Sequence, residues 1–151
     1  MAAQYAFGDS DVARERLAIV ADTFEAPTRQ LLEDLPTAHP RYVVDMGCGP
    51  GHTTALLRAR FPHCALTGID ASAAMVKEAR DRVRDASFAV LDVTEPLRLP
   101  ADLVYSRLLL GHLPDPGAAL AHWAAATRPP GLVVCEEPVR YRSADALFRE
   151  Y

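Results

Sequence analysis

The stretch from Tyr42 to Leu57, YVVDMGCGPGHTTALL, carries glycines at alternate positions, Gly47, Gly49 and Gly51, directly behind an apolar run. Glycine lacks a side chain, so a loop of this kind can turn sharply and bring its backbone against a ligand. Dinucleotide-binding loops use the spacing GxGxxG, in which the third glycine lets helix and strand pack closely. Here that third position is His52, and the glycine comes one residue earlier. The GxGxG spacing therefore fits a dinucleotide site poorly.

Three acids stand at or near the ends of apolar stretches. Asp70 is placed to accept hydrogen bonds from both hydroxyls of a ribose, with capping of the next helix as the alternative. Asp92 is placed to accept from an adenine amine while the Val93 amide faces the ring, with a turn before Thr94 as the alternative. Asp45, just before the glycines, is expected to order the loop by accepting backbone amides. Two ligand-facing acids without a phosphate clamp suggest an adenosine compound that lacks a pyrophosphate.

The elements that must position these residues follow from apolar periodicity and from proline and glycine punctuation. The pattern predicts short buried strands that alternate with helices, which calls for a parallel sheet covered on both faces. Right-handed crossovers then give a doubly wound α/β fold with its ligand crevice at the carboxyl ends of the strands. We expect strands at Arg41–Met46, Cys64–Asp70, Ser87–Val93, Ala101–Arg107 and Gly131–Glu137, and helices at Asp11–Phe24, Pro27–Leu35, Gly51–Phe61, Ser72–Val83, Asp115–Thr127 and from Ser143 onward.

The whole chain has the composition of one globular domain, with 151 residues of which 50% are hydrophobic and 24% charged. The net charge of -4 argues against a nucleic-acid or membrane partner. No CxxC pair or histidine cluster indicates a metal site. The first 20 residues contain Asp9, Asp11 and Glu15 and no apolar segment, so a cytoplasmic setting is expected.

Five motifs, in order along Tyr42 to Pro138, resemble those of the class I S-adenosylmethionine-dependent methyltransferases, most of all the branch that acts on small molecules. The resemblance implies a Rossmann-like fold, S-adenosyl-L-methionine as cofactor and a small-molecule acceptor. The opening YAFGDSDVARERL resembles a lead-in of the same branch. The motifs are VVDMGCGPG, LTGID, AVLDV, ADLVYSRLLLGHLPDP and RPPGLVVCEEP.

Carried across residue by residue, the resemblance implies a complete cofactor site. The segment Gly47–Gly49 would pass close to the methionine part, Asp70 would hold the ribose, and Asp92 with Val93 would hold the adenine. The turn at Ser106 and Arg107 would approach the amino-acid end, and Tyr5 could close over it. The candidate cofactor-binding residues are therefore Tyr5, Asp45, Gly47, Cys48, Gly49, Gly51, Asp70, Asp92, Val93, Ser106 and Arg107.

His112 is the candidate catalytic base. It follows the predicted fourth strand on the crevice side, where it could take a proton from an acceptor hydroxyl, with packing inside its loop as the alternative. Methyl transfer from a sulfonium needs mainly alignment and desolvation, so a base is dispensable when the acceptor is already nucleophilic. Glu136 and Glu137 face the same region and could bind an acceptor or lie in solvent.

The chain departs from the family pattern in two places. PPG at Pro129–Gly131 stands where the family usually has a Pro-Gly-Gly turn. The family's sheet is also expected to have an antiparallel pair of strands beside the fifth strand, and this sequence stops before it. The expected organisation is a single domain, with a helical lead-in at 1–40, a core at 41–138 and the start of a helix at 139–151. An uncovered fifth strand would favour self-association or a partner at that edge. A shortened, non-catalytic binding module is therefore the main alternative to an enzyme, and a nicotinamide-dependent oxidoreductase is the third hypothesis.

Overall fold

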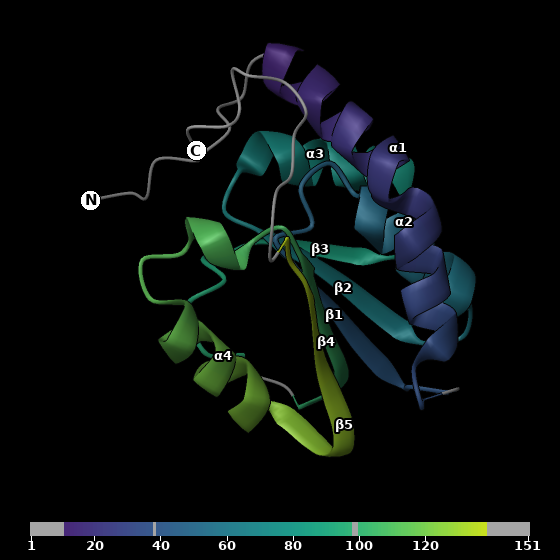
Figure 1. Ribbon diagram of the computed structural model, residues 1–151, viewed down its shortest axis with the longest axis vertical. Helices are drawn as coiled ribbons and strands as arrows, with labels where there is room; N and C mark the ends of the chain where they lie inside the picture. Colours follow the sequence, from purple (N-terminus) through teal and green to yellow (C-terminus); the bar gives the residue numbers. More distant parts are fainter. Residues whose placement is uncertain (1–10, 38, 98–99, 139–151) are drawn as a thin grey trace.

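The computed structural model describes residues 11–37, 39–97 and 100–138. Its centre is a parallel five-stranded sheet with the order β3-β2-β1-β4-β5 (Figure 1). The predicted doubly wound α/β fold is confirmed. The strands are β1 (Tyr42–Met46), β2 (Ala65–Asp70), β3 (Ser87–Val90), β4 (Ala101–Arg107) and β5 (Thr127–Glu136).

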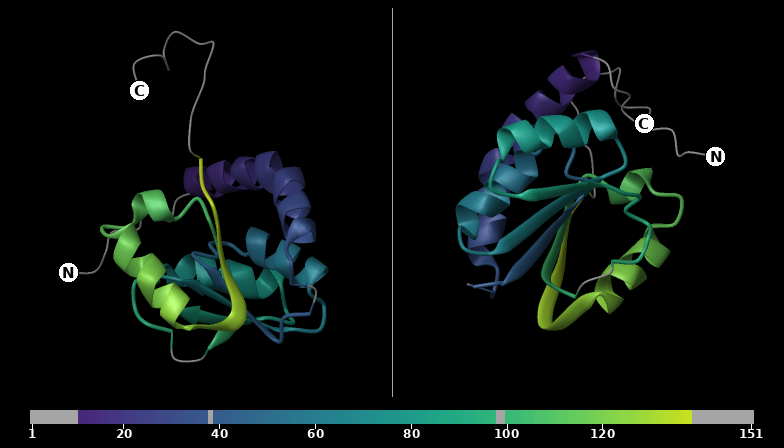
Figure 2. Two further views of the ribbon diagram at one scale, coloured as in Figure 1. Left: turned by 60° about the horizontal axis from the view of Figure 1, so that its bottom comes forward. Right: turned by 180° about the vertical axis from the view of Figure 1, so that it is seen from behind.

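The helices cover both faces of the sheet (Figure 2). Those that precede β1, β2 and β3 lie on one face, and the helix between β4 and β5 lies on the other, because the strand order reverses between β1 and β4. This reversal is the topological switch point, where sheets of this kind bind ligands. The helices are α1 (Asp11–Asp34), α2 (His52–Arg60), α3 (Ala73–Arg82), the short 3-10 helix η1 (Leu110–His112) and α4 (Pro116–Ala125).

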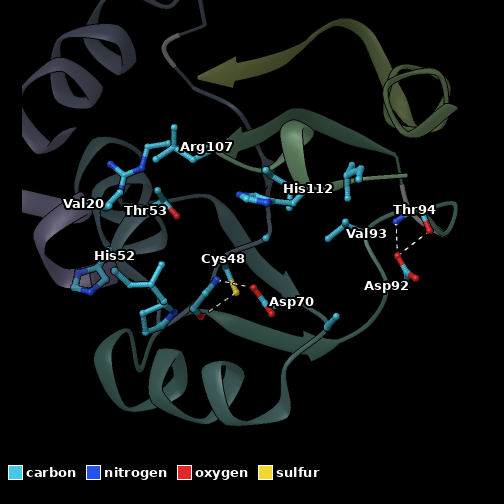
Figure 3. Close-up of a pocket in the computed structure, with 18 of the residues that line it drawn as sticks. Val20, Cys48, His52, Thr53, Asp70, Asp92, Val93, Thr94, Arg107 and His112 are labelled. Carbon is cyan, nitrogen blue, oxygen red and sulfur yellow. Dashed lines mark hydrogen bonds between the residues drawn. The ribbon is translucent and has the colours of Figure 1, made fainter. Parts of the chain in front are cut away.

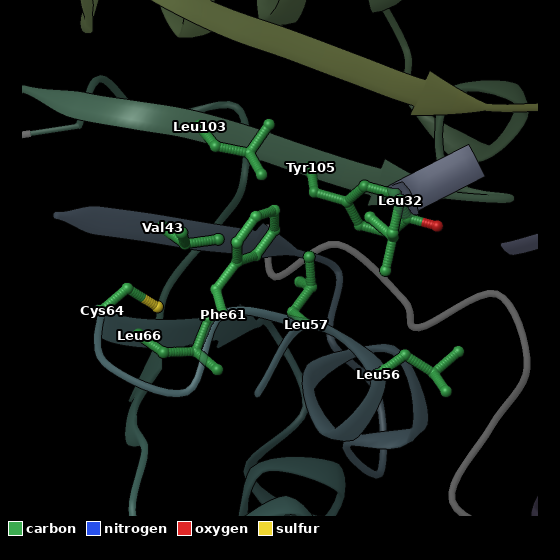
Figure 4. Packing of buried hydrophobic residues seen from close by; sticks show 9 residues of the cluster. All are labelled: Leu32, Val43, Leu56, Leu57, Phe61, Cys64, Leu66, Leu103 and Tyr105. Carbon is green, nitrogen blue, oxygen red and sulfur yellow. The ribbon is translucent and has the colours of Figure 1, made fainter. Parts of the chain in front are cut away.

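Two apolar clusters hold these layers together. The cluster on the α1 and α2 face contains Leu32, Leu57 and Tyr105, each no more than 1% exposed (Figure 4). The cluster on the α4 face is centred on Trp123, which packs against Met46 and other strand residues and is fully buried. Alternate residues of β1 and β4 face these two clusters, so the central strands are mostly apolar. The charged or hydroxyl-bearing exceptions at buried positions are Asp45 and Ser106, and β4 also carries Asp102 and Arg107.

The first two predicted helices are one. The prediction ended the first helix before Pro27, but α1 runs through this proline and bends along its length (Figure 1). A proline in a helix removes one hydrogen bond and introduces a kink. Thr28 and Leu32, in the turns that follow, are buried against the rest of the protein, and this packing keeps the second half helical.

Two strand boundaries differ from the prediction by more than one residue. β3 ends at Val90 rather than Val93, because the Asp92 carboxylate accepts from the backbone of Thr94 and turns the chain away. β5 begins at Thr127 rather than Gly131, with an irregular register opposite the start of β4. The expected altered turn at Pro129–Gly131 is thus part of the strand, and the Pro129–Pro130 bond is cis.

Among the described helices, none combines the length and apolar character that a bilayer crossing requires. The helix expected from Ser143 onward lies outside the described residues.

Trp123 joins α4 to the loop after β3, because its indole Nε1 donates to the buried Val93 carbonyl at 2.8 Å. We expect Trp123→Phe to lower the free energy of unfolding by roughly 2–4 kcal/mol, through a lost hydrogen bond and a cavity. Chemical denaturation followed by circular dichroism measures this, because the variant lacks the only tryptophan and so has no indole fluorescence to follow. The control is His122→Ala, which removes an exposed ring bonded to the Thr94 carbonyl of the same loop, and a loss below about 1 kcal/mol is expected there. Equal losses in the two variants would contradict the role given to Trp123.

Candidate functional site

A cavity of about 290 Å³ opens at the carboxyl ends of the strands, next to the switch point (Figure 3). Its floor comes from the loop after β1 and the ends of β2 and β4. Its walls come from α1, the start of α2, the loop after β3 and the segment around η1. The lining residues are Arg16, Leu17, Val20, Gly47–Pro50, His52, Thr53, Asp70, Ala71, Asp92–Thr94, Arg107–Leu109 and His112–Pro114.

All three glycines of the loop adopt left-handed backbone angles, with φ of 66° at Gly47, 51° at Gly49 and 86° at Gly51. Side chains rarely tolerate these angles. A Cβ at Gly51 would lie 3.0 Å from Ala79 Cα, so this glycine permits the loop to pack on α3. A Cβ at Gly49 would meet no heavy atom within 4 Å, and Gly49 lines the cavity. The absent side chain at Gly49 therefore leaves space for a ligand against the backbone.

Asp70 ends β2 and is 3% exposed. Its Oδ2 accepts from the Gly49 amide at 2.9 Å, and its Oδ1 accepts from the Ser72 amide at 2.9 Å. The cap of α3 is Ser72, whose hydroxyl accepts from the Met75 amide. The alternative role of Asp70 as a helix cap is thus taken by Ser72, while Asp70 itself fixes the glycine loop and lines the cavity. Its role toward a ribose remains a prediction.

Asp92 is exposed at the cavity wall, and the turn proposed as its alternative role is present. Its Oδ1 accepts from the Thr94 amide at 2.9 Å and from the Thr94 hydroxyl at 2.7 Å (Figure 3). Val93 beside it is buried, with its carbonyl held by Trp123. Turn formation places both residues at the cavity, so it is compatible with the predicted contact to adenine and does not test it.

Asp45 lies inside β1, is 1% exposed and does not line the cavity. Its Oδ2 accepts from the hydroxyls of Thr53 at 2.7 Å and Thr54 at 2.6 Å. We expected backbone amides of the loop to donate to Asp45. This was wrong, because the donors are two side-chain hydroxyls from the first turn of α2. Burial raises the pKa of this carboxyl to about 6, while the two hydroxyls and the charge of Arg107 oppose the rise.

Cys48 and Ser106 contribute to the site in different ways. Cys48 lines the cavity, and its amide donates to the Ile69 carbonyl at 3.0 Å. Burial raises the pKa of its thiol, so it stays protonated and unreactive. Ser106 is fully buried on the α4 side of the sheet and is not part of the cavity wall. The expected turn at Ser106 and Arg107 is the end of β4, and the chain turns only at Leu108.

Arg107 lines the cavity from the end of β4, and its Nη1 donates to the Thr28 hydroxyl at 3.1 Å. Thr28 in turn donates to the Glu136 carboxylate, which also accepts from the Tyr105 hydroxyl at 2.6 Å. Glu137 accepts from the backbone amides of the segment that begins η1. Glu136 therefore joins α1 to β4 and β5, and Glu137 fixes the segment that begins η1. These are structural contacts, whereas the sequence suggested that the two glutamates bind an acceptor or lie in solvent.

His112 is exposed in η1 at the cavity wall, on the β4 side in Figure 3. Its position agrees with the predicted placement, and its role as a base remains a prediction. Tyr5 lies outside the described residues. Within the described part, no three His, Cys, Asp or Glu side chains are grouped so that they could hold a metal ion.

Sequence reasoning missed the contribution of α1 to the cavity. Leu17 and Val20 stood in the apolar pattern of the first predicted helix, but they line the cavity and are only partly buried. Leu108 was missed as well, and it has a φ of 53°, which is uncommon outside glycine and often found at functional sites. Periodicity identifies an inward helix face, but it does not distinguish a core from the wall of a cavity.

The buried Asp45 makes stability depend on pH. Its pKa lies at about 6 in the folded chain against 3.8 for a free side chain, so between these values the folded chain keeps a proton that the unfolded chain has lost. Its contribution to the free energy of unfolding therefore falls as pH rises through this window, by about 3 kcal/mol in total. Asp45→Asn still accepts from both threonines but has no such dependence. We expect its stability relative to wild type to rise by that amount between pH 4 and pH 7. Urea denaturation across this range measures it, and a constant difference would contradict the raised pKa.

Comparisons with known proteins agree with this geometry. A family model described as "Methyltransferase domain" matches residues 16–151. The trans-aconitate 2-methyltransferase of Methylobacterium radiotolerans is 39% identical over 114 residues, which are 74% of this chain and 44% of that protein. The Escherichia coli enzyme of the same name is 37% identical over 113 residues, 74% of this chain and 45% of that protein. The chain thus spans less than half the length of these relatives.

Solved structures show the same fold. One is a complex between the Haloferax volcanii Trm112 methyltransferase activator and a putative methyltransferase, with a TM-score of 0.76 and 28% identity over 87% of this chain and 60% of that one. Another is the plantazolicin methyltransferase BpumL in complex with SAH, with a TM-score of 0.65 and 20% identity over 83% of this chain and 53% of that one. S-adenosyl-L-methionine is the cofactor of this family. The chain belongs to the class I S-adenosylmethionine-dependent methyltransferases.

Proposed function

We propose that this chain binds S-adenosyl-L-methionine in the 290 Å³ cavity and serves methyl transfer to a small-molecule acceptor. The observation that carries the proposal is the open space at Gly49, where an added Cβ would meet nothing within 4 Å although the loop is otherwise tightly packed. A cofactor pressed against this backbone would fill that space. A cytoplasmic location is part of the proposal and remains a prediction from the sequence.

The donor and acceptor groups around Gly49 suit the parts of this cofactor. Asp70 is a carboxylate at the cavity floor, suited to ribose hydroxyls, and Asp92 with Val93 would meet the adenine. Leu17, Val20 and other apolar side chains make up much of the wall and would exclude water. The cofactor supplies a methyl group on a sulfonium, which is a good leaving group. The chain would supply alignment and a dry cavity.

The acceptor proposed here is a small carboxylic acid. The relatives described above are named for trans-aconitate, and they support an acceptor of this class. The chain spans less than half of each relative, so trans-aconitate itself is a first compound to assay. A methyl-release assay with this acid and a mixed panel of hydroxylated and carboxylated acceptors tests the transfer step.

Gly49→Val should weaken the binding of S-adenosylhomocysteine, the demethylated cofactor, by at least tenfold, because a branched side chain would occupy the cofactor's space. Isothermal titration calorimetry measures the change. Gly51→Ala is the matched control, since it imposes similar backbone strain but directs its Cβ at α3. We expect Gly51→Ala to reduce stability more than affinity. Unchanged affinity in Gly49→Val would refute a ligand against this loop.

His112→Ala tests the predicted base. With a hydroxyl acceptor, turnover should fall about 10²–10⁴-fold while the affinity for S-adenosylhomocysteine is kept. Single-turnover kinetics with saturating cofactor separate this loss from weaker binding. A fall of less than threefold would remove His112 from the mechanism. A carboxylate acceptor of the kind proposed above is already nucleophilic and needs no base, so the test of His112 uses the hydroxylated acceptors of the panel.

A second candidate function is a binding module that does not transfer methyl groups. Among the described strands, β5 lies at the end of the sheet and pairs with β4 alone, so one side of it could pair with another chain. One structural neighbour was solved with an activator protein, which makes association with a partner or a second copy a reasonable hypothesis. Binding of S-adenosylhomocysteine without methyl release to any acceptor, together with association in sedimentation velocity, would favour this module.

A further inference from the structure

A second cavity of about 220 Å³ lies between α1 and α2, and it shares two wall residues, His52 and Arg107, with the first. Its lining is largely charged, whereas the first cavity is mostly apolar. The other charged residues of the lining are Asp22, Glu25, Arg29 and Arg82. A polar cavity that borders the cofactor cavity is placed where a second, polar reactant could lie beside the cofactor.

Most N–H donors of the Arg107 guanidinium at this shared wall have no partner in the described part of the chain. Its one hydrogen bond to the described part of the chain is that from Nη1 to the Thr28 hydroxyl. No described carboxylate lies within ion-pair distance of it. An arginine carries five N–H donors in a planar fork. Arg107 is half-buried and lines both cavities.

Thr28 holds one arm of the Arg107 guanidinium in place. The Thr28 side chain is fully buried, and its hydroxyl donates to Glu136 Oε2 at 2.7 Å while it accepts from Arg107. Tyr105 donates to the same Glu136 oxygen at 2.6 Å. The Glu136 carboxylate is thus satisfied by two hydroxyls, and it does not pair directly with the guanidinium.

Arginines outnumber acids in the lining of the second cavity, with Arg29, Arg82 and Arg107 against Asp22 and Glu25. Burial lowers the pKa of His52, and the charges of Arg82 and Arg107 lower it further, with larger effects than the opposing ones of Asp22 and Glu25. Glu25 is paired with Arg29 at 2.9 Å, and both acids are exposed. An anion that enters meets Arg107, which has no described carboxylate within ion-pair distance.

We propose that this polar cavity is a subsite for a carboxylate group of the methyl acceptor, with the Arg107 fork as its anchor. A planar guanidinium binds a carboxylate through two parallel hydrogen bonds, and this match is more specific than that of a lysine. The proposal rests on the proposed function, because it assigns a place to the acceptor. The same chemistry could instead serve the carboxylate of the cofactor's amino-acid end, so the experiment separates these two sources.

The test measures binding by calorimetry in the chain saturated with S-adenosylhomocysteine. Succinate is the probe, and succinamide is its uncharged match. We expect succinate to bind and succinamide to bind at least tenfold more weakly. The proposal moves Arg107 from the predicted cofactor contacts to the acceptor. Arg107→Gln should therefore weaken succinate about 10- to 100-fold and leave S-adenosylhomocysteine within threefold. Arg107→Lys keeps the charge without the fork and should be intermediate. Arg29→Gln removes a paired arginine from the same cavity and should change succinate affinity less than threefold.

Three results would overturn the proposal. The first is equal binding of succinate and succinamide, and the second is unchanged succinate affinity in Arg107→Gln. The third is weaker binding of S-adenosylhomocysteine in that variant with unchanged binding of 5′-methylthioadenosine, which lacks the amino-acid end and would therefore assign Arg107 to the cofactor. Circular dichroism checks that each variant is folded. If Arg107→Gln does not fold, the succinate affinity of Arg107→Lys is used to test the proposal instead. Failure of the wild-type chain to bind S-adenosylhomocysteine would instead refute the proposed function.

Discussion

The buried carboxylate of Asp45 is the contact on which the geometry of the site depends. It lies in β1 and accepts hydrogen bonds from the hydroxyls of Thr53 and Thr54 in the first turn of α2. It therefore joins the strand and the helix across the glycine loop. Without those two hydroxyls, a carboxylate that is 1% exposed would have to be neutral or carry a large desolvation cost. The distance between β1 and α2 is thereby fixed, and the loop between them must follow a tight path. Left-handed glycines are the residues that allow such a path.

A second carboxylate fixes the loop from the neighbouring strand. Asp70 accepts the Gly49 amide while its other oxygen accepts the Ser72 amide, which ties β2, the loop and the start of α3 together. The loop is therefore held from both β1 and β2 before any ligand arrives. A loop that is already ordered loses little conformational entropy on binding. The open space beside Gly49 is thus a permanent feature of the fold.

The sequence allowed the sheet and the cofactor candidates to be predicted because their signals are local. Runs such as Tyr42–Met46 and Ala101–Arg107 are short, bounded and rich in apolar residues, and in parallel sheets their ends must meet at one edge. The boundaries that were wrong depend on competition between elements. Packing of Thr28 and Leu32 carries α1 through Pro27, and the side chain of Asp92 ends β3 early. Glu136 was misjudged because its partners, Thr28 and Tyr105, stand 108 and 31 residues away along the chain. No local pattern contains such a pairing.

The Thr28 hydroxyl links two properties that would otherwise be independent. It holds the middle of α1 to β5 through Glu136, and it fixes one arm of the Arg107 guanidinium at the end of β4. The earlier turns of α1, at Leu17 and Val20, line the first cavity, and its Asp22 and Glu25 line the second. A shift of α1 would therefore change both cavities and the direction of Arg107 together. The hydroxyl donates its one hydrogen bond to Glu136 and accepts one from Arg107, which has donors only. The guanidinium is thus separated from the Glu136 carboxylate by one hydroxyl, and it has no described ion-pair partner at the wall that the two cavities share.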